Sequence, residues 1–94
     1  MKELKKGMFA RSLAGHDKGC LYVILDADEK RVLLTDGKSR PVERPKRKNR
    51  MHIQPDHEDS GVFAPGSPDH PAELNTAVRK AIRAKEGKGC QKQM

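Results

Sequence analysis

Apolar residues in the first half of the chain occur in short runs that are separated by polar or glycine-containing turns. The run at 21–25 is almost wholly apolar, and a second run at 31–35 contains a valine and two leucines. Asp36 and Gly37 follow as a strong turn signal, because glycine readily adopts positive φ angles. Short apolar runs between tight turns are typical of strands. The pattern predicts a small, mainly β barrel rather than a βαβ unit.

The expected strands of this barrel are residues 7–13, 20–25, 31–35, 39–43 and 51–53. The fourth contains Pro41, which lacks an N–H, so that strand should be short or lie at an edge. Phe9, Tyr22 and Phe63 are the only Phe or Tyr residues among 94, and Trp is absent. A chain of this length can form one small domain, and its core must be largely aliphatic.

Charge divides the chain into three parts. Residues 1–54 carry a net charge of +7, residues 55–72 carry −4 with no Lys or Arg, and residues 73–94 carry +4. The middle part is also rich in Pro and Gly, which is typical of linkers. We therefore predict a barrel at 1–54, an acidic Pro/Gly linker at 55–71, and a basic helix with a frayed tail at 72–94.

The expected helix has one narrow apolar face. This face is formed by Leu74, Ala77, Val78, Ala81 and Ile82, which recur at helical spacing. Pro71 suits a first helical turn, and basic residues near the other end suit the negative end of the helix dipole. Gly87 and Gly89 should end the helix.

The overall net charge of +7 favours a polyanionic partner. No apolar stretch approaches the roughly 20 residues that span a bilayer, and no hydrophobic region follows the basic N-terminus. We therefore expect a cytoplasmic protein with no membrane partner. The two cysteines, Cys20 and Cys90, are expected to be thiols in that compartment.

The segment Gly7–Ile24 places Gly15 and Gly19 around a polar loop between two expected strands. With the run 32–37 and the basic residues that follow, this segment resembles the KOW motif of ribosomal and transcription-elongation proteins. Over residues 5–54 the chain is similar to the L-fourteen-e type of large-subunit ribosomal proteins of archaea and eukaryotes, and to small bacterial KOW-domain RNA-binding proteins.

The KOW resemblance implies an SH3-like β-barrel that binds ribosomal RNA, with Gly15, Gly19 and Gly37 as structural glycines of the motif. Between Arg44 and Arg50 the chain has five bases and no acid, and Pro45 favours an extended backbone there. An extended basic segment can place successive side chains along a phosphate backbone. The expected RNA-binding residues are Arg11, His16, Lys18, Arg40, Arg44, Lys46, Arg47, Lys48 and Arg50. Because aromatic residues are few, recognition of shape and phosphates is favoured over base stacking.

The sequence contains no nucleophile–base pair, Walker loop or dinucleotide fingerprint, and its Cys and His residues lack metal-site spacing. We therefore expect a non-enzymatic protein without a cofactor or metal. One alternative is a protein-interaction adaptor of the translation or transcription machinery that uses the apolar face of the helix at 72–86 for docking. Ribosomal or transcription proteins are then further possible partners.

Overall fold

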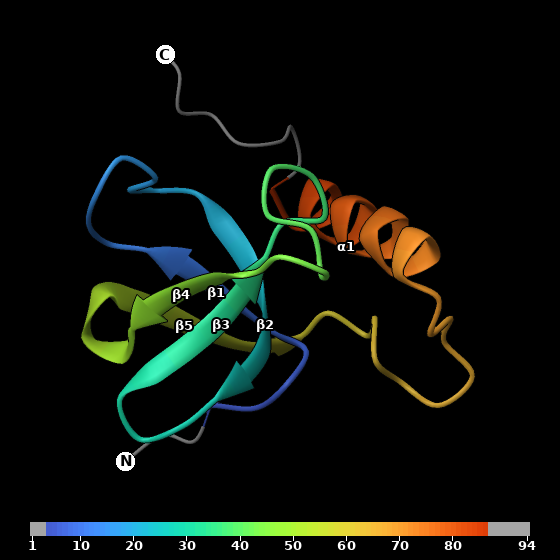
Figure 1. The fold of residues 1–94 in the computed structure, drawn as a ribbon, viewed down its shortest axis with the longest axis horizontal. Helices are drawn as coiled ribbons and strands as arrows, with labels where there is room; N and C mark the ends of the chain where they lie inside the picture. Colours follow the sequence, from blue (N-terminus) through green and yellow to red (C-terminus); the bar gives the residue numbers. More distant parts are fainter. Residues whose placement is uncertain (1–3, 87–94) are drawn as a thin grey trace.

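The computed structural model describes residues 4–86, without the side chain of His57. In this range five antiparallel strands form one sheet in the order β4-β3-β2-β1-β5, which curls into a half-barrel and is followed by one long helix (Figure 1). The elements are β1 (Met8–Ser12), β2 (Leu21–Ala27), β3 (Arg31–Thr35), β4 (Lys46–Asn49), the 3-10 turn η1 (Arg50–His52), β5 (Ile53–Asp59) and α1 (Pro71–Glu86). The structure confirms the expected mainly β fold with one C-terminal helix.

Both faces of the central strands are buried. In β2, Tyr22 and Ile24 belong to a cluster inside the half-barrel, to which β1, β3 and β5 also contribute. Leu21 and Val23 point the opposite way and join a second cluster on the outer face of the sheet. Alternate side chains of a strand lie on opposite faces, so a strand buried on both sides must be apolar at every position. This requirement explains the nearly continuous apolar run of β2.

Helix α1 covers the outer face of β1 and β2 (Figure 1). Val78 is fully buried against that face, and Ala81 and Ile82 pack beside it. Val62 and Phe63 also pack there, from the segment between β5 and α1. The apolar face of the helix is therefore occupied by the protein's own sheet. The face that the adaptor alternative would use for docking therefore packs on the sheet, with Val78 buried and Ala77, Ala81 and Ile82 partly buried.

Residues 39–43 were expected to form a strand but lie in an irregular loop. Asp36 Oδ1 accepts hydrogen bonds from the backbone N–H groups two and four residues later, each at 2.8 Å. The N–H of Val42 donates to the Asn75 side chain of α1 at 2.8 Å instead of to another strand. These polar side chains satisfy the backbone locally. The fourth strand is displaced into the basic run, where Lys46–Asn49 pairs with β3.

The last strand starts and ends later than expected. The Asn49 side chain caps η1 by accepting the Met51 N–H at 2.8 Å, which turns most of the expected strand 51–53 into a 3-10 turn. Strand β5 then pairs with β1 and extends to Asp59, through the first five residues of the predicted linker. Pro55 is tolerated because β5 is an edge strand.

The helix occupies Pro71–Glu86, as the apolar spacing and the proline at its start indicated. The expected stop signals at Gly87 and Gly89 and the frayed tail lie outside the described residues.

Candidate nucleic-acid interface

The loop between β1 and β2 is joined to β4 by one carboxylate, that of Asp17. It accepts hydrogen bonds from Tyr22 Oη at 2.8 Å and Ser12 Oγ at 2.9 Å. It also forms ion pairs with Lys48 Nζ at 3.3 Å and Lys46 Nζ at 3.7 Å. We call these five side chains the Asp17 network. The glycine-flanked loop and the basic run, the two features expected to bind RNA, therefore lie side by side. An acidic side chain makes the contact between them.

The Asp17 side chain is only 14% exposed, although it belongs to the polar loop between Gly15 and Gly19. Burial raises the pKa of this carboxyl, but hydrogen bonds from Tyr22, Ser12 and Lys48 and the charge of Lys46 lower it more, to about 2. Burial and the neighbouring Asp17 raise the pKa of the Tyr22 phenol. At neutral pH the network therefore holds one fixed negative charge between two lysines.

The basic run does not present its five cations to solvent together, because strand alternation splits them. Lys46 and Lys48 point into the half-barrel toward Asp17, and the Lys48 side chain is 11% exposed. Arg47 points to the outer face, where it is exposed. Arg44 is exposed before the strand, and Arg50 Nη1 donates to the Asp28 carbonyl at 2.7 Å. Two of the five cations are therefore neutralised in part within the fold.

The other expected contact residues also differ in their surroundings. Arg11 Nη1 donates to the Gly19 carbonyl at 2.8 Å and to Glu86 Oε2 at 3.0 Å, so this side chain ties the loop to the end of α1. The side chains of His16, Lys18 and Arg40 are exposed. Arg11 is thus a structural clamp, whereas His16, Lys18 and Arg40 are open to a ligand.

Sequence reasoning missed a basic hollow of about 230 Å³ between α1 and the loop after β3. Lys38, Arg79 and Arg83 line it, over an apolar floor that includes Leu21 and Ile82. Its one acidic lining residue, Asp36, already accepts the two backbone hydrogen bonds that shape the loop. We call this the α1 hollow. The spacing of Arg79 and Arg83 by one helical turn was a signal for it, but their partner Lys38 is 41 residues from Arg79.

Gly37 allows α1 to approach this loop closely. It has a φ of 75°, and a Cβ at this position would lie 2.4 Å from the Asn75 carbonyl oxygen. Arg79 Nη1 donates to the Gly37 carbonyl at 2.6 Å. Gly37 therefore does more than make the expected turn, since it sets the distance between the loop and the helix that form the α1 hollow.

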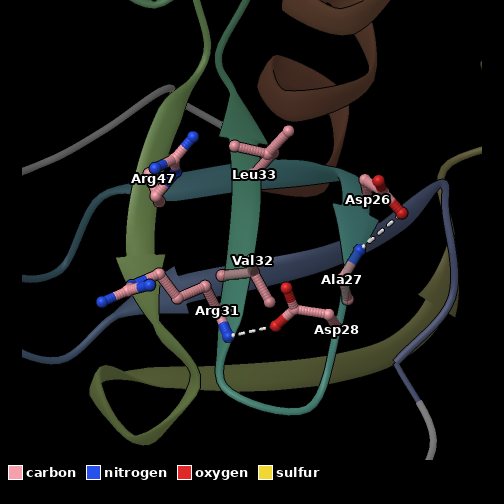
Figure 2. Close-up of a pocket in the computed structure, with 7 residues that line it drawn as sticks. All are labelled: Asp26, Ala27, Asp28, Arg31, Val32, Leu33 and Arg47. Carbon is pink, nitrogen blue, oxygen red and sulfur yellow. Dashed lines mark hydrogen bonds between the residues drawn. The ribbon is translucent and has the colours of Figure 1, made fainter.

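A second hollow, of about 300 Å³, lies on the outer face of β3 (Figure 2). Arg31 and Arg47 stand on its β4 side, and Asp26 and Asp28 stand on its β2 side. Leu33 lies between the two groups. We call this the β3 hollow. It contains Arg47 from the expected site, together with Arg31, which sequence reasoning did not select.

The acids of β5 do not face the α1 or β3 hollow. Lys85 of α1 forms ion pairs with Asp56, at 2.6 Å, and with Glu58. Lys85 also lies over the Phe9 ring, 5.5 Å from its centroid. The contacts of Lys85 therefore hold this end of α1 against the sheet. Arg79 and Arg83 are the cations of α1 that line a hollow.

Within residues 4–86, no group of three or more His, Cys, Asp and Glu side chains is arranged to hold a metal ion. The described part of the chain also has no helix with the length and apolar character that a membrane span requires. In comparisons with known proteins, no family model and no curated protein matches this chain. The features that indicate a function are therefore the chemistry of the two hollows and the motif resemblance.

Proposed function

We propose that this protein is a non-enzymatic RNA-binding module that holds phosphates of folded, ribosome-associated RNA. The observation that carries the proposal is the α1 hollow, which Lys38, Arg79 and Arg83 line. Its one acid, Asp36, already accepts two backbone hydrogen bonds, and Arg79 is held by the Gly37 carbonyl. Cations grouped over a partly apolar floor suit a phosphate group with its attached sugar. Exposed Arg40 and Arg44 extend the positive surface along the same loop.

The few aromatic rings support recognition of shape and phosphates over base stacking. Phe9 and Tyr22 are buried, and Phe63 is partly buried with Lys6 Nζ 4.6 Å above its ring. None of them offers the open platform on which proteins commonly stack single-stranded bases. RNA is favoured over other polyanions by the resemblance of the first half of the chain to KOW proteins, which also favours the ribosomal setting.

The test is a salt titration of binding to folded ribosomal RNA fragments, for the native protein and the variant K38A/R83A. Loss of two phosphate contacts should weaken binding to every fragment and reduce the log–log salt slope by about 1.5. The control K5A/K30A removes two exposed cations that do not line the α1 hollow, one before β1 and one in the turn between β2 and β3. An equal effect of the two double variants would show that net charge alone governs binding, and would refute the α1 hollow as the site.

A protein-interaction adaptor is the second candidate, and one exposed apolar pair favours it. Met51 is 82% exposed and Leu13 is 45% exposed. Their backbones come close together, because the Leu13 N–H donates to the carbonyl of His52, the residue after Met51, at 2.8 Å. Partners that survive nuclease treatment and are lost in L13S/M51S would support the adaptor. Partners that are all lost on nuclease treatment would support the RNA-binding function.

A further inference from the structure

The β3 hollow keeps opposite charges apart on one face of the sheet. The register places Asp26 of β2 opposite Leu33, and Leu33 opposite Arg47 of β4. Neighbouring strands are about 4.8 Å apart, so the two charged residues stand roughly 10 Å apart at the backbone. No ion pair joins the aspartates and the arginines of this hollow among the described residues. The leucine between them forms an apolar strip that separates an acidic wall from a basic one.

The acidic wall is held in place by hydrogen bonds from the backbone. Asp28 Oδ1 accepts the N–H groups of Lys30 at 2.8 Å and Arg31 at 2.7 Å, which fixes the turn between β2 and β3. Asp26 Oδ1 accepts the N–H of Ala27 at 2.9 Å. That hydrogen bond restrains the Asp26 carboxylate, and both of its oxygens keep the capacity to accept further hydrogen bonds. In Figure 2 the guanidinium groups of both arginines lie on the far side of Leu33 from the aspartates.

A ligand that fits this arrangement must be anionic at one end and carry hydrogen-bond donors at the other, with a flat apolar part between them. A nucleotide has this chemistry, with its phosphate at one end and its base at the other. The volume of about 300 Å³ is at the small end of the range for ligand pockets, which suits one nucleotide.

The acidic wall also discriminates among bases. A carboxylate has only acceptors, so it pairs best with two adjacent donors. On the Watson–Crick edge, guanine presents an N1–H beside a 2-amino group. Adenine, cytosine and uracil each place an acceptor next to their donor, which a carboxylate repels. Inosine keeps the N1–H of guanine but lacks the 2-amino group.

We propose that the β3 hollow receives one unpaired guanine nucleotide of the bound RNA, with Asp26 accepting from the guanine edge and Arg31 and Arg47 facing the phosphate. This inference rests on the proposed RNA-binding function and adds a base preference to it. An unpaired nucleotide is required, because the guanine edge that Asp26 would read is occupied in a Watson–Crick pair.

The test uses one RNA hairpin with a single bulged nucleotide, made as five versions with guanine, inosine, adenine, cytosine or uracil at the bulge. Fluorescence anisotropy should show about tenfold tighter binding of the guanine version than of the inosine version. In D26N this ratio should fall close to one. The matched control is D69N, which removes an exposed carboxylate outside the hollow and should keep the ratio. R47A should weaken binding of all five versions.

The outcomes separate this inference from the function on which it rests. Equal binding of all five hairpins by the native protein would overturn the guanine site while leaving phosphate binding intact. A guanine preference that persists in D26N would show that another residue reads the base, and would also overturn the proposal. Failure of the native protein to bind any of the hairpins or folded ribosomal RNA fragments would instead refute the RNA-binding function.

Discussion

Lys48 and Asp17 are 31 residues apart in the sequence, yet Lys48 Nζ lies 3.3 Å from Asp17 Oδ1. This ion pair joins an edge strand of the half-barrel to the loop between β1 and β2. It also decides which cations are available for a ligand, because a lysine that neutralises Asp17 is only in part available to neutralise a phosphate.

Replacement of Asp17 by Asn should destabilise the fold. The variant removes the charge that two lysines face, and Lys48 is only 11% exposed, so its ammonium group loses its partner where water compensates poorly. We expect the free energy of unfolding in urea to fall by about 2 kcal/mol. D69N, which changes an exposed aspartate, should stay within about 0.5 kcal/mol of the native protein. Equal stability of D17N and D69N would contradict the structural role of the network.

The stability of the native protein should depend on Asp17 ionisation at acid pH. The pKa of this carboxyl is about 2 in the fold and about 3.8 ordinarily, so the unfolded chain takes up the proton first as pH falls. The stabilisation is complete above about pH 4 and is lost as pH falls through about 2. We expect a loss of about 1–2 kcal/mol from this group, after allowance for screening by nearby solvent.

Urea titrations of the native protein and D17N between pH 2 and pH 6 measure this contribution. Other carboxyls with lowered pKa values, such as Asp56 beside Lys85, titrate in both proteins and cancel in the comparison. The difference in unfolding free energy between the two proteins should therefore shrink as pH falls. A constant difference would show that Asp17 does not titrate as the structure implies.

Gly37→Ala should be far more costly than Gly19→Ala. Both glycines have positive φ angles, which cost an alanine about 1–2 kcal/mol. At Gly37 the new Cβ would also lie 2.4 Å from the Asn75 carbonyl oxygen, whereas nothing lies within 4 Å at Gly19. We expect G37A to lose about 3 kcal/mol or more and G19A about 1 kcal/mol. Thermal unfolding of the two variants provides the comparison, and similar losses would argue against the close approach of α1.

Arg47 and Lys48 are adjacent in the sequence but should respond differently to replacement by Ala. Arg47 is exposed on the outer face, so R47A should reduce the salt slope of RNA binding by about 0.7–0.9 with little effect on stability. Lys48 is held by Asp17, so K48A should lower the unfolding free energy by about 1 kcal/mol and change the slope less than R47A does. The reverse pattern would show that Lys48 faces the RNA.

Most of the strands could be predicted because their signals are local. The run at 31–35 became β3 without change, and the almost wholly apolar run at 21–25 became most of β2, which is buried on both faces. The strand expected at 39–43 does not form, because backbone N–H groups of that segment donate to the side chains of Asp36 and the distant Asn75. The extension of β5 into an acidic segment was missed because its pairing partner, β1, lies some 45 residues earlier.

The sequence predicted two properties of the candidate site. One is its overall positive charge, and the other is the involvement of the glycine-flanked loop and the basic run. Alternation along a strand and one-turn spacing along a helix follow from backbone geometry, so they can be read from adjacent residues. Which cations keep their charge for a ligand depends on partners far along the chain. Asp17 forms ion pairs with Lys46 and Lys48, and Glu86 forms one with Arg11. The close approach of α1 to Gly37 creates the α1 hollow. Such pairings exist only after folding, because Coulomb and hydrogen-bond interactions depend on distance in space.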